Sequence, residues 1–293
     1  MSSSVAKNGT MSSVLSHNAY GKSGIRLTKV SRHADRQDFK EMTVNIQLEG
    51  DFAQSYTTGD NTAIVATDSM KNTVYALAAK NDLNDIESFA RLLAEHFLQK
   101  YAHVSQSNVH IVEDLWQRIE SGGKPHAHSF VGGGSEKRVA TVHADRKNVV
   151  IQSGLDNLFV AKTAQSKFFG FLRDELTTLA DTDDRIFATA LEMTWLYNQA
   201  PVSYDAVYKK IRQVVLDVFA NNESLAVQQT LYQMGEAVLA AVAEVDEITI
   251  TMPNQHRLVF NLEPLGLPNK NEIFYLVDEP FGLITGTIKR GDA

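Results

Sequence analysis

Hydrophobic and polar residues alternate with a period of two along several stretches of this chain. The clearest stretch runs from Thr43 to Leu48, where every second residue is apolar. Such alternation is typical of an antiparallel strand with one buried face. Similar patterns predict extended segments at residues 25–30, 108–119, 129–143, 149–161, 185–197, 247–252 and 272–289. The glycine-rich residues 132–135 are predicted to form a hairpin turn.

Four other stretches repeat their apolar residues every three or four positions, as one face of an α-helix does. Their predicted bounds are residues 70–79, 84–101, 204–220 and 225–242. Asn84 followed by Glu87 resembles a capping box, in which two side chains satisfy free amide groups of the first helical turn. The short apolar run at 63–66 is predicted as a buried strand, and the polar residues 67–69 are predicted to cap the helix that begins at Met70.

The predicted elements follow the same order in both halves of the chain. Hairpin, helix pair and hairpin occur twice, which predicts an α+β fold of two tandem modules, each an antiparallel sheet with a helix pair on one face. The modules are expected at residues 20–147 and 148–293, after a disordered tail at residues 1–19. Unpaired sheet edges favour pairing with neighbours, so assembly into an oligomer is expected.

Composition and charge narrow the class of protein. A hydrophobic share of 43%, a charged share of 22% and no apolar run of about 18 residues predict a globular chain without membrane spans. The net charge of -7, with both signs interspersed, argues against a nucleic-acid partner. The chain has no cysteine, which excludes disulfides, thiolate catalysis and cysteine-ligated metals. Without an export signal or a Ser-Lys-Leu ending, a cytoplasmic protein of a bacterial type of host is expected.

Several motifs are spaced along both halves of the chain. They are YGK at 20–22, VATDSMKNTVYALA at 65–78, QSKFFGF at 165–171, DRI at 184–186, SLAVQQTLY at 224–232 and PNQH at 253–256. In this order the set resembles the urate oxidase (uricase) family, over essentially residues 20–289. The resemblance implies the tunnelling fold (T-fold), in which two modules per chain assemble as a homotetramer and the sheets close into barrels.

The resemblance also implies an activity. Members of this family oxidise urate with dioxygen and water to 5-hydroxyisourate and hydrogen peroxide, a step of purine degradation. The conjugated ring of urate can itself carry electrons to dioxygen, so neither a metal nor an organic cofactor is expected. No G-x-G-x-x-G dinucleotide motif follows a predicted strand, which agrees with this expectation.

The residue types at the motif positions suit a flat, anionic purine. The Phe168 ring offers a face for stacking, an interaction worth about 1–3 kcal/mol for nucleobases. Arg185 offers a planar fork of donors with a permanent charge, and Gln228 offers a donor and an acceptor to an amide edge. In the family, the backbone at the position of Val227 adds a contact to the ligand.

The resemblance assigns catalysis to Lys22, Thr67 and His256, which would form a proton relay bridged by the threonine hydroxyl. A lysine has an ordinary pKa of about 10.4, so Lys22 would need burial or a nearby positive charge to act as a base near neutrality. Asn254 and Thr67 are expected to hold dioxygen, and later water, above the ring. Thr67 and Asp68 are expected to reach urate from another subunit, which places the active sites at subunit interfaces.

Other interpretations stay open from the residues alone. Phe168 suits a core position, Gln228 suits a solvated helix face, and Arg185 could pair with Asp183 or Asp184. For the whole protein, the alternatives are a tunnelling-fold cyclohydrolase or aldolase acting on a purine or pterin, and a non-catalytic urate-binding protein. Those cyclohydrolases and aldolases hold an amino-pyrimidine edge with an acidic side chain, where this chain has a neutral glutamine.

Two histidines outside these motifs are candidate metal ligands. His126 and His128 are two residues apart in an extended segment, so both can point to one face. Neither a cysteine nor a clear carboxylate partner accompanies them, and the predicted site contains no metal.

Overall fold

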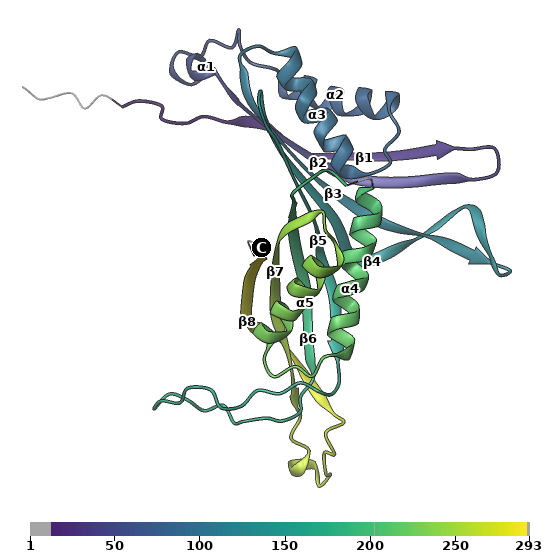
Figure 1. Cartoon of the computed structure of the whole chain (residues 1–293), viewed down its shortest axis with the longest axis vertical. Coiled ribbons are helices and arrows are strands. Elements are labelled where there is room, and N and C mark those ends of the chain that lie inside the picture. The colour runs from purple at the N-terminus through teal and green to yellow at the C-terminus, as the bar shows by residue number, and fades with distance from the viewer. Residues whose placement is uncertain (1–12, 202, 292–293) are drawn as a thin grey trace, which may run out of the picture.

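A computed structural model describes residues 13–201 and 203–291, so residues 1–12 of the expected tail lie outside the described residues. The strands form one antiparallel sheet in which each strand pairs with the next along the chain (Figure 1). This order leaves β1 and β8 as the edges of an open sheet. The strands are β1 (Tyr20–Arg32), β2 (Gln37–Gly50), β3 (Val104–Ser121), β4 (Lys124–Asp145), β5 (Val149–Lys162), β6 (Phe187–Tyr197), β7 (Val245–Val259) and β8 (Phe274–Lys289).

The helices pack on one side of this sheet, α2 against β1, α3 against β3 and β4, and α5 against β7 and β8 (Figure 1). The helical elements are α1 (Ala53–Thr57), α2 (Thr67–Lys80), α3 (Ile86–Lys100), α4 (Tyr204–Asn221), α5 (Val227–Ala241) and the short 3-10 helix η1 (Glu263–Leu265), which lies in the connection between β7 and β8. Within the described residues, none of the helices is both long and apolar enough to cross a lipid bilayer. The arrangement confirms the predicted α+β fold class, while closure into a barrel stays a prediction because the sheet of one chain is open.

Two separate hydrophobic cores lie between the sheet and the helices. One is built from β1 to β4 with α2 and α3, and the other from β5 to β8 with α4 and α5. The alternation in β2 holds, since Val44, Ile46 and Leu48 are all buried in the first core. The proposed boundary between the modules, at residues 147 and 148, falls in the short connection between β4 and β5.

The two halves repeat specific contacts as well as the order of their elements. Arg146, just after β4, donates to the Ala102 carbonyl at the end of α3 at 2.7 Å, and Arg290, just after β8, donates to the Leu239 carbonyl of α5 at 2.8 Å. Lys29 also donates to carbonyl oxygens at the end of α2. Each cation lies at the negative end of a helix dipole, where it stabilises the helix by about 0.3–1 kcal/mol.

A buried ionic cluster joins the two modules. Glu87 of α3 and Arg138 of β4 are almost fully buried, and Arg138 Nη2 lies 2.8 Å from Glu87 Oε2. Arg138 also pairs with Asp205 in the first turn of α4, and the Ser153 hydroxyl of β5 donates to Glu87 at 2.6 Å. Burial raises the pKa of Glu87, although Arg138 and Ser153 oppose this effect.

This cluster explains why the predicted capping box is wrong. The Glu87 carboxylate turns into the interior to meet Arg138, so it does not reach back to the start of the helix. The N-cap residue is Asp85, whose side chain accepts from Ser88 N at 2.7 Å.

Two further local predictions are wrong. Residues 63–66 form no strand, because the Val65 N–H donates to the Tyr20 hydroxyl at 2.7 Å instead of joining the sheet, and α2 already begins at Thr67. The hairpin between β3 and β4 turns at residues 122–123, where both glycines have positive φ. The glycines of residues 132–135, predicted to form a hairpin turn within 129–143, instead lie inside β4, where Gly133 approaches the Leu115 backbone too closely for a side chain.

Candidate active site

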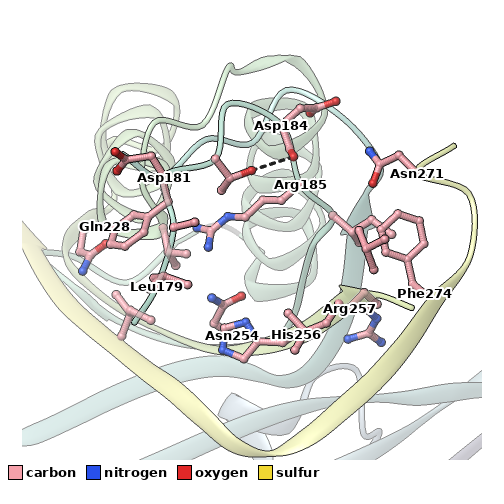
Figure 2. A pocket seen from close by; sticks show the side chains of 18 residues that line it. Leu179, Asp181, Asp184, Arg185, Gln228, Asn254, His256, Arg257, Asn271 and Phe274 are labelled. Atoms are coloured by element: carbon pink, nitrogen blue, oxygen red, sulfur yellow. Dashed lines mark hydrogen bonds between the residues drawn. The ribbon is translucent and has the colours of Figure 1, made fainter. Parts of the chain in front are cut away.

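A cavity of about 410 Å³ opens in the second module (Figure 2). It lies between the start of α5, the strands β7 and β8, and the long connection at residues 163–186. Six predicted site residues line it, namely Phe168, Arg185, Val227, Gln228, Asn254 and His256. They come from three distant parts of the sequence, so only tertiary structure places them around one space.

Backbone pairing holds the connection 163–186 beside the cavity. Phe168 and Thr182 exchange two hydrogen bonds, at 2.9 and 3.0 Å, so the segment folds back on itself. Ser166 pairs in a second bridge with Ser224, which lies in the link between α4 and α5. The backbone that carries the Phe168 ring is therefore fixed next to the start of α5.

Arg185 extends its guanidinium into the cavity from just before β6 (Figure 2). The guanidinium carbon lies 5.1 Å from the centre of the Phe168 ring. Burial lowers the pKa of Arg185, and no acidic neighbour among the described residues opposes this effect. The alternative pairing with Asp184 is not formed, since that carboxylate instead accepts from Gln165 N at 2.9 Å. The positive charge of Arg185 therefore faces the cavity.

Helix α5 begins at the cavity. Val227 is buried, Gln228 is exposed, and the N-cap residue Ala226 makes no side-chain hydrogen bond. The first amide groups of a helix lack carbonyl partners and carry partial positive charge, which favours a nearby anion. The helix end and Arg185 therefore both favour a negatively charged ligand.

Asn254 and His256 reach the cavity from β7 (Figure 2). The pairing with β8 is irregular here, because the partner changes from Gly282 at Asn254 to Val277 at His256. Such irregularities redirect side chains next to sites. Burial, and to a smaller extent the charge of Arg185, lowers the pKa of His256. The imidazole is thus neutral over a wider pH range than usual and can accept a proton.

The other predicted site residues, Lys22, Thr67 and Asp68, lie in the first module and do not line this cavity. Thr67 is the first residue of α2, and the Asp68 carboxylate lies 2.5 Å from Lys71 Nζ. The hydrogen bond and charge of Lys71 lower the pKa of Asp68 most, and the charge of Lys22 on β1 adds a smaller lowering. One chain therefore carries two separate groups of predicted site residues.

The cavity also contains residues that the motifs did not indicate. Asp181, Arg257, Asn271 and Phe274 line it (Figure 2). Arg257 is held by a bond of 2.8 Å from Nη1 to the Gln255 carbonyl. These residues lie in the connection, in β7 and β8, and in the hairpin that joins them. No periodicity or spacing in the sequence distinguishes them from ordinary loop and strand residues.

The two histidines considered as metal ligands lie together on β4. Their ring centres are 4.6 Å apart, and His128 N donates to His126 Nδ1 at 3.3 Å. In the described part of the chain, no group of three or more histidine, aspartate or glutamate side chains is arranged to hold a metal ion.

Two repeated antiparallel modules with helices on one face define an α+β protein of the tunnelling-fold class. A family model of uricases matches residues 18–143 and 151–285. The chain is 42% identical to the uricase of Arthrobacter globiformis over 277 aligned residues. This alignment covers 94% of this chain and 90% of that relative. It is 40% identical to the uricase of Aspergillus flavus, with 92% and 95% covered. The crystal structure of the Arthrobacter uricase superposes with a TM-score of 0.92 at 41% identity, covering 97% of both chains.

The chain belongs to the uricase family. Uricase is urate oxidase, an oxidoreductase, and the membership predicted from the motifs is confirmed. The comparisons give no support to the cyclohydrolase, aldolase or non-catalytic alternatives.

Proposed function

We propose that this chain oxidises urate with dioxygen and water to 5-hydroxyisourate and hydrogen peroxide. The observation that carries the proposal is the gathering of Phe168, Arg185 and Gln228 around one cavity that favours an anion. Urate gives up two electrons from its own ring, dioxygen takes them up with two protons, and water supplies the new hydroxyl group. The reaction balances without an organic cofactor or a metal, and cofactor-independent activity is part of the proposal.

Three contacts would bind urate in this site. The ring would stack on Phe168, Arg185 would donate to its anionic edge, and Gln228 would pair with the opposite amide edge. The backbone of Val227, at the start of α5, would add a further donor. The cavity supports this assignment because these groups surround a space large enough for a purine-sized ligand.

Proton transfer is assigned to Lys22, Thr67 and His256, with the threonine hydroxyl between the two bases. The lowered pKa of His256 supports its part, because a neutral imidazole can take a proton that urate loses. Asn254 lies two residues before His256 on β7 and would hold dioxygen, and later water, together with Thr67.

The internal junction between the modules supports a site shared by two copies of the chain. Gln228 is the second residue of α5, as Glu87 is of α3, and Asp68 is the second residue of α2. Asp205 has the same place in α4, and within one chain Arg138 joins it to Glu87. If two copies meet as the two modules of one chain do, Gln228 of one copy would face Asp68 of the other. The ligand would then lie between them, in the position that Arg138 has between Glu87 and Asp205.

The edges of the sheet support assembly of several copies. β1 and β8 are edge strands, and the β8 residues Leu276 and Leu283 are 63% and 65% exposed in the single chain. Exposed apolar edge strands favour pairing with another chain. We propose a homotetramer in which the sheets close into barrels, and a cytoplasmic location.

The assigned roles can be separated by comparing turnover with binding. Lys22→Met and Thr67→Ala should lower kcat by about 100-fold or more while changing urate binding less, because they disrupt proton transfer and the oxygen site but leave the contacts of Arg185 and Gln228 to urate. Arg185→Ala and Gln228→Ala should raise the urate Kd by about 10-fold or more, because they remove polar contacts to the bound anion. Turnover is measured by oxygen uptake with peroxide detection, and Kd by dialysis of urate without oxygen.

The exposed Lys80 at the end of α2 provides a control, since Lys80→Met should change neither quantity. Equal loss of binding in all four test variants would contradict the roles. A wild-type protein that does not consume urate and oxygen would contradict the function itself.

A further inference from the structure

Phe168 is one member of a column of stacked side chains. Its ring is nearly parallel to that of Phe171, with ring centres 4.9 Å apart and an interplanar angle of 10°. The guanidinium carbon of Arg173 lies 4.6 Å from the centre of the Phe171 ring, and that of Arg185 lies 5.1 Å from the centre of the Phe168 ring. Phe168 and Phe171 thus form a stacked pair, with one guanidinium over each ring.

The two ends of this column face different surroundings. Phe168 and Arg185 line the cavity, whereas Phe171 and Arg173 are not among its lining residues. Phe171 therefore covers the side of the Phe168 ring that points away from the cavity. It is half-buried, although the neighbouring Phe169 is 57% exposed. Phe168 itself borders the cavity, where the Arg185 guanidinium lies beside its ring.

The outer end of the column is anchored to the other arm of the connection. Arg173 Nη2 lies 3.1 Å from Asp181 Oδ2, and Arg173 Nη1 donates to the Leu179 carbonyl at 3.1 Å. Asp181 Oδ1 also accepts from Gly170 N at 3.1 Å. Gly170 has a φ of +70°, which turns the chain so that Phe171 returns over Phe168. The charged group is thus held over the ring, where a cation is attracted by the aromatic face.

We propose that Phe171 and Arg173 are positioning residues that fix the plane of the Phe168 ring before a ligand arrives. The inference rests on the proposed function, in which urate stacks on Phe168. A ring that is already ordered loses less freedom on binding, so the column increases affinity for flat anions. It touches neither dioxygen nor the proton relay, so it leaves the chemical step unchanged.

Kinetics and binding of variants at position 171 test this role. Phe171→Ala should raise both KM and the oxygen-free Kd of urate about 5–10-fold, with kcat within about twofold, because only binding depends on the platform. Phe171→Tyr, which keeps the stacked ring, should restore wild-type values. Arg173→Gln should raise KM by about 2–5-fold, since it removes the cation over the ring. Phe169→Ala is the matched control and should change neither KM nor Kd.

Phe171→Leu keeps most of the buried bulk without an aromatic face, so it separates stacking from folding. Its thermal unfolding should match that of the wild type while its KM rises toward that of Phe171→Ala. An unchanged Kd in Phe171→Ala, an equal fall of kcat, or the same effect in Phe169→Ala would overturn the positioning role. Failure of the wild type to bind or oxidise urate would instead overturn the proposed function.

Discussion

Burial and neighbouring charge change the pKa values of two single residues in the cavity, Arg185 and His256. Arg185 points its guanidinium into the cavity, and burial lowers its pKa with no acidic neighbour among the described residues opposing this effect. His256 lies close enough to this cation for its pKa to be lowered further than burial alone lowers it. The His256 imidazole is therefore more readily uncharged, and in this form it can accept a proton from the ligand.

The lowered pKa of His256 predicts a contribution to the pH dependence of stability. Between the folded pKa and the ordinary value of about 6.5, the unfolded chain binds a proton that the folded chain does not, so stability falls as the pH decreases through this window. Below the folded pKa the penalty stays constant. His256→Gln should therefore lose less stability on acidification than the wild type.

Urea unfolding midpoints of both proteins, measured from about pH 7.5 to about pH 5, give this difference directly. Subtracting one curve from the other removes the titration of the remaining groups. Two parallel curves would show that the surroundings of His256 do not disfavour its charged form.

At the scale of whole elements, helix ends and one ion cluster decide where the site can form. The start of α5 meets the connection 163–186 through the bridge between Ser166 and Ser224, which sets the distance between stacking ring and helix end. At the other junction, α3 and α4 meet through Glu87, Arg138 and Asp205. The start of the second long helix in each module thus borders a cavity at α5 and a closed ionic cluster at α3.

Removing the cation of that cluster should destabilise the chain strongly. Arg138→Met leaves the buried Glu87 without its partner, and breaking a buried ion pair costs about 3–5 kcal/mol. Joint replacement as Glu87→Leu with Arg138→Met should recover much of the loss, because no uncompensated charge remains. Denaturant unfolding at neutral pH measures both changes.

The matched control is the pair of Arg91 and Glu95 on the outer side of α3, whose side chains are 51% and 33% exposed. Arg91→Met should cost no more than about 1 kcal/mol, because water screens an exposed pair. An equally small effect of Arg138→Met would show that the cluster does not hold the modules together.

At the scale of the whole molecule, a single chain separates the residues that the proposed reaction needs. Lys22, Thr67 and Asp68 lie in the first module, and the cavity with Arg185 and His256 lies in the second. The open edges β1 and β8 provide the surfaces through which another copy can bring the two groups together. Assembly is therefore part of the proposed chemistry and not only a source of stability.

Mixed assembly of two inactive chains tests this arrangement. Each proposed site combines the first-module residues of one copy with the second-module residues of another. When Thr67→Ala and Arg185→Ala chains are coexpressed in equal amounts, about a quarter of these sites contain neither substitution, so about a quarter of the wild-type rate should return. Coexpression of Thr67→Ala with Lys22→Met is the control, because both changes damage the same group. No recovery in the first mixture would place the whole site within one chain.

Local patterns in the sequence determined most of the secondary structure. The alternation at residues 43–48 and the apolar face at residues 84–101 predicted β2 and α3, because each signal is contained in neighbouring residues. The repeated order of elements that predicted two modules, and the motifs that identified the family, are contained in the sequence in the same way. Local signals failed at residues 63–66 and 132–135, where a distant tyrosine hydroxyl and a close backbone contact decide the conformation.

Tertiary structure alone decided which side chains meet. Glu87 reads as a capping residue until Arg138, far along the chain, draws it into the interior. Phe171 reads as one more aromatic in a loop until Gly170 and Asp181 place it behind Phe168. Spacing along a chain constrains contacts within a few residues, whereas cavities, ion clusters and stacked columns depend on how distant elements pack. The sequence therefore determined the elements and the family, and the fold determined the cavity and its surroundings.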